Sequence, residues 1–395
     1  MENKEQPDIR YLGFTDAWEL CRLKELAEFN PKSNLPERFE YIDLESVVGT
    51  ELVGHRTENR ESAPSRAQRL AQKNDVFYQT VRPYQKNNYL FNLPYDNYVF
   101  STGYAQMRPK NSGYFLLTLV QEENFVNRVL ERSTGTGYPA INSSDLAKLS
   151  VKVPTDKKEQ QKIGEFFKEL DNTIVLYQHE LENLKQTKQG FLQKMFPKEG
   201  EKVPEIRFSD FTDDWEQCKA KFLFNSVVEK GKKELPVLSV TQENGVVYRD
   251  DVGIDIKYDV KTLPSYKVVR PGDFIISLRS FQGGFELSDK LGITSPAYTI
   301  FEPKVKKSHD ESFWKIKFKS FSFIESLKTV TFGIRDGKSI SFSDFGSLKL
   351  SFPSIDEQQK ISNFFKQLDD TIALHQRELE LLQKTKKAFL QKMFV

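Results

Sequence analysis

The sequence predicts an α+β protein with an internal pseudo-two-fold repeat: two globular domains separated by two long α-helices that form an antiparallel coiled coil. Three observations lead to this prediction. The hexapeptide FLQKMF occurs at residues 191–196 and again at residues 389–394. A long helical pattern precedes both copies, and the segments between the matching parts differ. A repeat of this size indicates two similar structural units within one chain.

The repeat extends well beyond the hexapeptide. Residues 163–196 and 361–394 share 22 identities in 34 aligned positions. The segment PDIRYLGFTDAWELC at residues 7–21 likewise matches PEIRFSDFTDDWEQC at residues 204–218. The tetrapeptide EQQK stands at the start of both helical patterns, each time a few residues after a proline. Both ends of each half therefore belong to a common frame.

Between the matching segments the two halves diverge. Residues 30–135 and 227–335 share little that can be aligned. Duplication followed by specialisation of the interior explains this pattern simply. We expect the common frame to provide two equivalent attachments, and the different interiors to serve two different targets.

The two helices are predicted from a hydrophobic period. Along residues 163–195 and 361–393, mainly apolar residues recur at alternating steps of four and three. A period of 3.5 residues over more than four heptads is typical of a coiled coil. Neither segment contains proline, whereas Pro154 and Pro353 stand just before them. Each helix should be roughly 50 Å long, and its apolar seam requires a partner, which the other copy can supply.

The connection between the helices favours an antiparallel arrangement. The second globular domain links the end of the first helix to the start of the second, and the two termini of a domain usually lie close together. Charge agrees, because the first helix is acidic near its start, at Glu165 and Glu169, and basic near its end, at Lys185 and Lys188. An antiparallel partner places acid against base. The helix macrodipole explains the same gradient equally well.

Composition restricts the classes of function. The mean hydropathy is −0.56, and no apolar run is long enough to predict a membrane span. The first ten residues lack a secretory signal pattern. Two cysteines do not make a disulfide framework, so a cytoplasmic protein is predicted. The four histidines stand far apart, so no metal site is predicted. A net charge of +2 neither indicates nor excludes a nucleic-acid partner.

The order of these parts resembles the specificity subunit of Type I restriction–modification systems. Two variable domains alternate with two similar helices, each helix follows a motif of the form D-[LF]-x-x-L…P…EQQKI, and each half opens with P-x-I-R-[YF]…W. The resemblance covers essentially the whole chain. It implies target recognition domain 1 at residues 1–154, spacer helix 1 at 155–199, target recognition domain 2 at 200–353 and spacer helix 2 at 354–395.

The resemblance also implies a subunit that is not an enzyme. Each target recognition domain would read a few base pairs of double-stranded DNA, and the helices would fix the distance between the two half-sites. The chain would recruit two modification (adenine methyltransferase) subunits and the restriction (translocase–endonuclease) subunits. No cofactor is expected on this chain, whereas S-adenosylmethionine, ATP and Mg²⁺ are expected on the partner subunits.

Two motifs suggest enzymatic chemistry but lack its context. NLPY at residues 92–95 resembles the [DN]-P-P-[YF] motif of adenine-N6 methyltransferases, yet no glycine-rich loop for a methyl donor precedes it. GIRDGKS at residues 333–339 resembles a phosphate-binding loop, but it has three residues between the glycines instead of four, and a strand-like segment follows it. We therefore predict no catalytic residues.

Bases are read chiefly by Arg, Lys, Asn and Gln side chains on exposed loops. The candidate loops are residues 78–88 and 101–110 in the first domain and 274–287 and 333–339 in the second, and Tyr138 lies on a further flexible loop. For each side chain the alternative is a solvated surface position. The predicted DNA-binding residues are Gln79, Arg82, Gln85, Lys86, Tyr104, Gln106, Arg108, Arg279, Ser280, Gln282, Arg335 and Lys338.

Two other classes of protein stay open at this point. A coiled-coil scaffold or adaptor without DNA specificity would hold two proteins apart and would show no preference among DNA sequences at any salt concentration. A free-standing DNA methyltransferase or nuclease would modify or cleave DNA without partner subunits. The missing methyl-donor loop argues against the methyltransferase.

Overall fold

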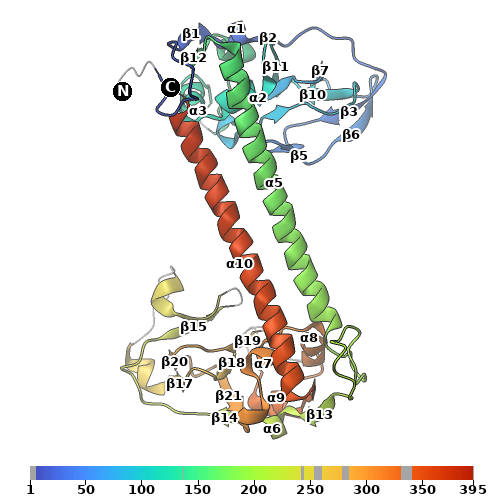
Figure 1. The fold of residues 1–395 in the computed structure, drawn as a ribbon, viewed down its shortest axis with the longest axis vertical. Helices are drawn as coiled ribbons and strands as arrows, with labels where there is room; N and C mark the ends of the chain where they lie inside the picture. The colour runs from blue at the N-terminus through green and yellow to red at the C-terminus, as the bar shows by residue number, and fades with distance from the viewer. Residues whose placement is uncertain are drawn as a thin grey trace. The chain divides into compact units, whose positions relative to one another are not determined.

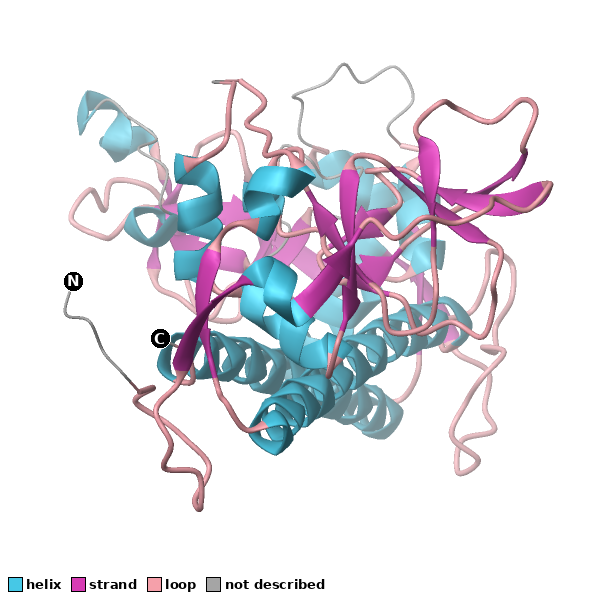
Figure 2. Cartoon of the chain, turned by 90° about the horizontal axis from the view of Figure 1, so that it is seen from above, coloured by secondary structure: helices cyan, strands magenta, loops and turns pink. Residues whose placement is uncertain are grey.

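The computed structural model describes residues 6–135, 137–241, 244–252, 260–277, 284–330 and 340–394. Contacts divide the chain into two units. The first unit comprises Met1–His179 and Arg377–Val395, and the second unit comprises Glu180–Gln376. Each unit contains a run of strands followed by short helices (Figures 1 and 2), which confirms the predicted α+β class.

The first unit is built from short strands and short helices, followed by the start of one long helix. These elements are β1 (Glu19–Arg22), α1 (Leu23–Leu26), β2 (Ala27–Phe29), β3 (Arg38–Ile42), β4 (Val47–Val48), β5 (Glu51–Leu52), β6 (Arg56–Asn59), β7 (Ala67–Leu70), β8 (Val76–Gln79), the 3₁₀ helix η1 (Pro83–Gln85), β9 (Tyr89–Leu90), β10 (Tyr98–Ser101), β11 (Tyr104–Pro109), α2 (Gly113–Gln121), α3 (Glu123–Glu131), α4 (Ser143–Ala147), β12 (Ser150–Val153) and α5 (Lys157–Lys194).

Two four-stranded sheets form the interior of the first unit, with the orders β6-β3-β10-β7 and β2-β11-β8-β9. The rings of Phe77 in β8 and Phe100 in β10 stack at 3.6 Å and join the two sheets. Strand β1 precedes the interior and β12 follows it, and the two pair antiparallel with Glu19 opposite Val153. The interior is therefore inserted between two paired strands of the common frame.

The second unit repeats this plan with different strands. Its elements are β13 (Glu216–Lys219), α6 (Ala220–Leu223), β14 (Phe224–Val227), β15 (Leu238–Thr241), β16 (Gly245–Tyr248), η2 (Arg249–Val252), η3 (Val260–Ser265), β17 (Lys267–Val269), β18 (Phe274–Ile276), β19 (Phe285–Leu287), β20 (Gly292–Thr294), β21 (Thr299–Pro303), η5 (Lys306–Ser308), α7 (Glu311–Lys317), α8 (Phe321–Leu327), α9 (Phe342–Ser347), β22 (Lys349–Phe352) and α10 (Ile355–Lys392).

The second unit has its own sheets but the same frame. One four-stranded sheet has the order β14-β21-β18-β19, and the pairs β15-β16 and β17-β20 stand beside it. The frame strands β13 and β22 pair antiparallel with Glu216 opposite Phe352, as β1 and β12 do in the first unit. The duplicated segments of the sequence thus fold alike, and the unlike interiors fold into different sheets.

The two long helices are present as predicted, each with 38 residues. In the first unit, Phe166 of α5 packs on Phe389 of α10 with ring centroids 4.9 Å apart. Asp171 of α5 forms an ion pair with Lys386 of α10 at 2.5 Å. Residues further along α5 therefore meet residues earlier in α10, so these segments run in opposite directions (Figure 1).

The second unit shows the matching contacts. Phe191 of α5 packs on Phe364 of α10 at 4.9 Å, and Lys188 forms an ion pair with Asp369 at 2.5 Å. Antiparallel pairing is therefore confirmed within each unit, and a coiled coil continuous along the full helix length stays a prediction. The paired lysines occupy seam positions of the heptad pattern, where a polar residue can fix register.

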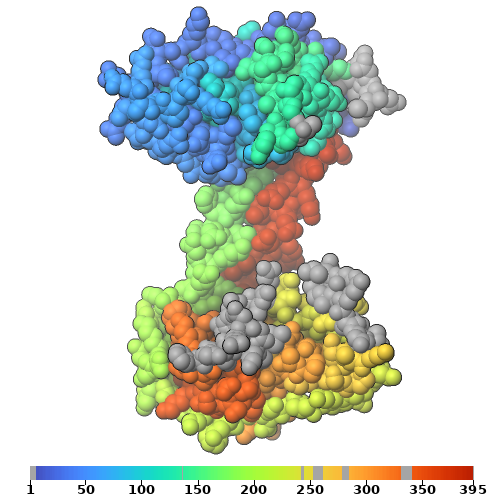
Figure 3. All heavy atoms as spheres, turned by 180° about the vertical axis from the view of Figure 1, so that it is seen from behind, coloured from blue at the N-terminus to red at the C-terminus, as the bar shows by residue number. Residues whose placement is uncertain are grey.

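The repeated FLQKMF segments complete the core of each unit. In the first unit, Phe394 is 7% exposed and meets Trp18 edge to face at 6.1 Å. In the second unit, Phe196 is 1% exposed and meets Trp215 edge to face, also at 6.1 Å. The space-filling view shows the red end of α10 against the first unit (Figure 3). Each hexapeptide is retained because its last phenylalanine fills an aromatic core.

A short segment at the start of each half ties the two helices together. In the first unit the backbone N–H of Ile9 donates to the carbonyl of Lys392 at the end of α10, at 2.9 Å. The next residue, Arg10, donates from Nε and Nη2 to both carboxylate oxygens of Glu159 in the first turn of α5, at 2.7 and 2.8 Å. The Glu159 side chain is 1% exposed. We call this pair of contacts the staple.

The second unit contains the same staple. Ile206 donates its backbone N–H to the carbonyl of Lys194 at the end of α5, at 3.0 Å. Arg207 donates to both oxygens of Glu357 in the first turn of α10, each at 2.8 Å. The repeated motifs P-x-I-R and EQQK are therefore the two halves of one buried contact.

Replacing Arg10 with Ala should destabilise the first unit by about 3–5 kcal/mol, because the Glu159 carboxylate would be left buried without its partner. Replacing both residues at once, as Arg10→Met with Glu159→Leu, should recover most of that loss. Urea denaturation of the purified chain measures both variants.

The control for this experiment is Lys148→Ala. It breaks an exposed pair with Asp145, in which the lysine side chain is 61% exposed, and should cost less than about 1 kcal/mol. A loss for Arg10→Ala no larger than that of the control would contradict the role assigned to the staple.

Candidate nucleic-acid interface

In the first unit, two predicted loops lie against each other. The backbone N–H of Arg82 donates to the carbonyl of Pro139 at 2.7 Å, and Val81 forms a β-bridge with Ala140. The guanidinium of Arg82 lies over the ring of Tyr138, 4.5 Å from its centroid. We call residues 81–86 and 137–140 the loop pair.

The backbone of the loop pair is held in a strained conformation. Arg82 and Lys86 flank the 3₁₀ helix η1 and have φ angles of 54° and 56°. Left-handed residues other than glycine cost roughly 1–2 kcal/mol each, and such residues gather at binding sites. The side chain of Gln121 donates to the carbonyl of Lys86 at 3.0 Å and helps to hold the loop in place.

Two tyrosines give the loop pair an exposed aromatic surface. Tyr84 is 49% exposed and Tyr138 is 66% exposed. Aromatic faces and a guanidinium on a fixed loop are suited to contacts with bases and phosphates. Sequence reasoning missed Tyr84, although its position directly after Pro83 in a turn was a signal for exposure.

Three of the predicted residues are buried in the first unit. Gln79 is 2% exposed, and Tyr104 and Gln106 are fully buried. Gln79 Nε2 donates to Gln85 Oε1 at 2.9 Å, and Gln106 Nε2 donates to Asp75 at 2.7 Å. These three side chains therefore do not lie on a surface that DNA can reach, and their contacts hold strands and loops together.

The physical reason for this correction is that β8 and its neighbour β11 are covered on both faces. Tyr78 of β8 and Ala105 of β11 pack into the core that contains α2, while Phe77 and Tyr104 pack into the aromatic core on the other face. A polar residue in such a strand points into the interior whichever way it faces, and it must then find a hydrogen-bond partner.

Two further predicted cations are already paired. Arg108 donates to both oxygens of the fully buried Asp75, at 2.9 and 3.0 Å, and its own side chain is 31% exposed. Lys86 donates to Glu123, and this hydrogen bond lowers the pKa of the Glu123 carboxyl below its ordinary value. Arg82, in contrast, contacts an aromatic ring, that of Tyr138.

The predicted DNA-binding residues of the second unit all lie outside the described residues. They are Arg279, Ser280, Gln282, Arg335 and Lys338.

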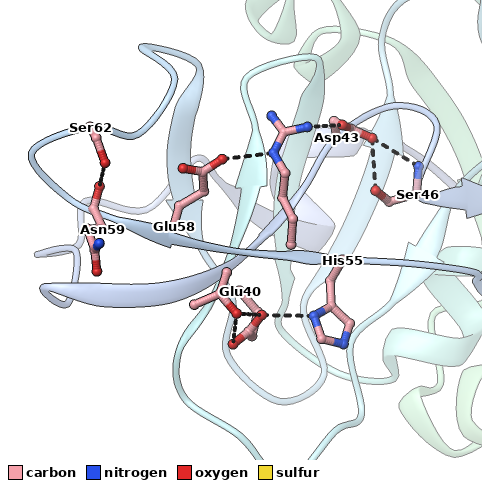
Figure 4. Close-up of polar contacts among 9 residues, drawn as sticks. Glu40, Asp43, Ser46, His55, Glu58, Asn59 and Ser62 are labelled. Atoms are coloured by element: carbon pink, nitrogen blue, oxygen red, sulfur yellow. Dashed lines mark hydrogen bonds and ion pairs between the residues drawn. The ribbon is translucent and has the colours of Figure 1, made fainter.

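The face formed by β3 and β6 has a different charge pattern. Arg56 donates to Glu58 at 2.8 Å and to Asp43 at 3.1 Å. His55 Nδ1 lies 2.8 Å from Glu40 Oε2 (Figure 4). The hydrogen bond with Glu58 raises the pKa of Arg56 above its ordinary value. With three carboxylates around one arginine and one histidine, this face is a poorer partner for phosphate than the loop pair.

Among the described residues, no three or more His, Cys, Asp or Glu side chains are grouped so that they could hold a metal ion. No helix within the described ranges is both long and apolar enough to cross a membrane.

The duplicated frame, the unlike interiors and the exposed loop pair define a two-domain recognition protein. The family of the Type I restriction modification DNA specificity domain matches the chain twice, at residues 15–186 and 207–384. The chain belongs to this family, which confirms the resemblance seen in its sequence.

Curated relatives carry the same description. The type I restriction enzyme MjaVIII specificity subunit of Methanocaldococcus jannaschii is 24% identical over 70% of this chain. A sequence assigned as the MjaX specificity subunit of the same organism is 26% identical, also over 70% of this chain. The HindI specificity subunit of Haemophilus influenzae is 27% identical over 41% of the chain. The matches span 68%, 66% and 38% of these three relatives, respectively. All three are named as specificity subunits, in agreement with the expected non-enzymatic class.

Solved structures share the fold. The S subunit of a Type I restriction–modification system from M. genitalium has a TM-score of 0.61, with 14% identity and coverage of 99% of both chains. The HsdS subunit from Thermoanaerobacter tengcongensis has a TM-score of 0.50, with 20% identity over 95% of this chain and 96% of that one. A chain from work on assembly of the type I R-M system has a TM-score of 0.58, with 19% identity over 97% of this chain and 99% of that one.

Strain in the loop pair predicts a difference between two substitutions at one position. Lys86→Gly and Lys86→Ala both remove the contact with Glu123, but only glycine adopts a φ of 56° without strain. The glycine variant should therefore be more stable than the alanine variant by about 1 kcal/mol. Urea denaturation of both variants measures the difference, and equal stabilities would show that the backbone is not strained there.

Proposed function

We propose that the chain is the DNA sequence-recognition subunit of a Type I restriction–modification complex and reads an asymmetric bipartite site with two target recognition domains. One observation carries the proposal. The same staple and aromatic core occur in both units, whereas the interiors inserted between the frame strands have different sheets. Two like attachments with two unlike readers suit a complex that is symmetric in its partners and asymmetric in its DNA target.

The proposed roles of the parts of the chain follow the predicted domain boundaries. Residues 1–154 and 200–353 act as target recognition domains, and residues 155–199 and 354–395 act as spacer helices. In the first domain the reading surface is the loop pair, where Arg82, Tyr84 and Tyr138 combine a cation with exposed aromatic rings. The second domain reads its half-site with loops that include the predicted Arg279 and Arg335.

The common frame recruits two modification subunits and the restriction subunits. Equivalent partners require equivalent surfaces, and the frame is the part of the chain that occurs twice. S-adenosylmethionine, ATP and Mg²⁺ are bound by those partners in this proposal, and the chain itself contributes no catalytic group. A similar fold in a structure from work on assembly of the type I R-M system supports the recruiting role.

The spacing role of the helices leads to a first test. Glu180 of α5 and His375 of α10 lie opposite each other, 3.6 Å apart, so one heptad inserted next to each residue lengthens both helices at the same level. Seven residues add about 10 Å of helix, or about 3 base pairs of DNA. Sequencing of methylated sites in cells with the complete system should show unchanged half-sites and a spacer longer by about 3 base pairs. Altered half-sites with an unchanged spacer would overturn the spacing role.

The reading role of the loop pair leads to a second test. Arg82→Ala and Tyr138→Ala should each weaken binding to the cognate duplex by about 10- to 100-fold, since one base or stacking contact contributes roughly 1–3 kcal/mol. Fluorescence anisotropy of the subunit assembled with its modification partners measures this on cognate and scrambled duplexes.

Arg56→Ala is the matched control for that test, because Arg56 is held between two carboxylates on the other face. It should leave the affinity for the cognate duplex unchanged. Equal affinity of the unmodified complex for cognate and scrambled duplexes at every salt concentration would instead identify a coiled-coil adaptor.

A further inference from the structure

The second unit contains a pocket with a volume of about 410 Å³. It lies between the segment after α5, the end of α7, helix α8 and strand β22. A volume of this order is typical of small-molecule sites. Its lining includes the charged residues Lys198, Glu199, Lys317 and Lys349 and the hydroxyl of Ser351.

Lys317 is the unusual member of this lining. It is the last residue of α7 and is only 3% exposed. Its Nζ donates to Ser351 Oγ at 3.1 Å and lies 5.4 Å from the ring centroid of Phe196 and 5.9 Å from that of Trp215. Within the described residues it forms no ion pair, and a buried ammonium without a counter-charge is costly.

The matching helix of the first unit shows that the fold does not need this ammonium. Helix α7 begins where Asp310 accepts the N–H of Phe313, and α2 begins where Ser112 accepts the N–H of Phe115. Counting from these matched caps, Lys317 corresponds to Leu119, which is 4% exposed in the first unit. An apolar residue therefore suffices at this place in the fold.

Two lining residues of the pocket, Lys317 and Ser351, have hydrogen-bond donors beyond the bond between them. An ammonium has three donors, and the bond to Ser351 uses one of them. Ser351 accepts that bond, and its own proton has no acceptor among the described residues. Burial lowers the pKa of Lys317 to about 7, so the amine can take up a proton near neutral pH when an anion enters.

We propose that this pocket binds the phosphate group of a small phosphate monoester. Lys317 and Ser351 donate to the phosphate oxygens, and the exposed lining residues Lys198 and Lys349 add positive charge. A phosphate suits several donors at once, because it has three acceptor oxygens and nearly two charges. The pocket is larger than one phosphate requires, and the remaining space holds the organic part of the ester. This inference does not rest on the proposed function.

Isothermal titration calorimetry on the full chain at pH 8 tests the proposal, with ribose 5-phosphate, orthophosphate and unphosphorylated ribose as probes. Ribose 5-phosphate should bind, ribose should not, and binding should take up close to one proton. Titration in two buffers of different ionisation enthalpy measures this proton uptake, because the observed heat of binding then differs between the buffers. Lys317→Leu introduces the residue found at the equivalent position of the first unit, and should weaken binding at least about tenfold and abolish the proton uptake.

Two further variants make the result decisive. Lys307→Met removes one exposed lysine outside the pocket and should leave binding unchanged, and Ser351→Ala should weaken it without removing the proton uptake. Thermal unfolding checks that each variant is folded. If orthophosphate binds as tightly as ribose 5-phosphate, the assignment of a monoester as the ligand is wrong and the site holds free phosphate. No binding to the unmodified chain, or equal affinity in Lys317→Leu, overturns the site altogether.

Discussion

The buried ion pair between Arg10 and Glu159, with its copy between Arg207 and Glu357, is the constraint on which each unit depends. A guanidinium that meets both carboxylate oxygens has one orientation available, so the opening segment is fixed against the first turn of one helix. The preceding isoleucine then caps the last turn of the other helix. Such a pair adds little net stability compared with apolar residues, but an unpaired member is costly. It therefore specifies geometry, and it appears twice because that geometry is needed twice.

Variation in the interiors follows from this arrangement. Each interior begins after one frame strand and ends before its antiparallel partner, so its two ends are held side by side. The staple and the aromatic core lie at the frame, and they do not depend on which strands the interior contains. One interior can thus place β3 parallel to β10 while the other builds β14-β21-β18-β19, and the helices are held in the same way. A protein that must change its target without changing its partners requires this separation.

The features predicted from the sequence were those set by local pattern or by repetition. The 3.5-residue period predicted both helices, and the close termini of the second domain predicted their opposite directions. Burial at single positions was not predictable, because it depends on distant segments. Gln106 looks like a reader in sequence, but Asp75 lies across the sheet and makes it an internal donor. Lys317 looks like a surface residue in ESFWKIK, but Phe196, Trp215 and Ser351 from distant parts of the chain lie beside its ammonium. The exposure of Tyr84 could be inferred only from its place in the turn that follows Pro83.

The difference between Leu119 and Lys317 shows how the two interiors have diverged at matching positions of one helix. Both residues lie in the divergent interiors, but the matched caps of α2 and α7 show that these two helices begin alike. Leucine fills its position with no buried charge. Lysine at the same place adds the desolvation of an amine, which the neighbouring rings and one hydroxyl offset only in part. The proposed ligand would offset this cost, and the open volume beside Lys317 is where it fits.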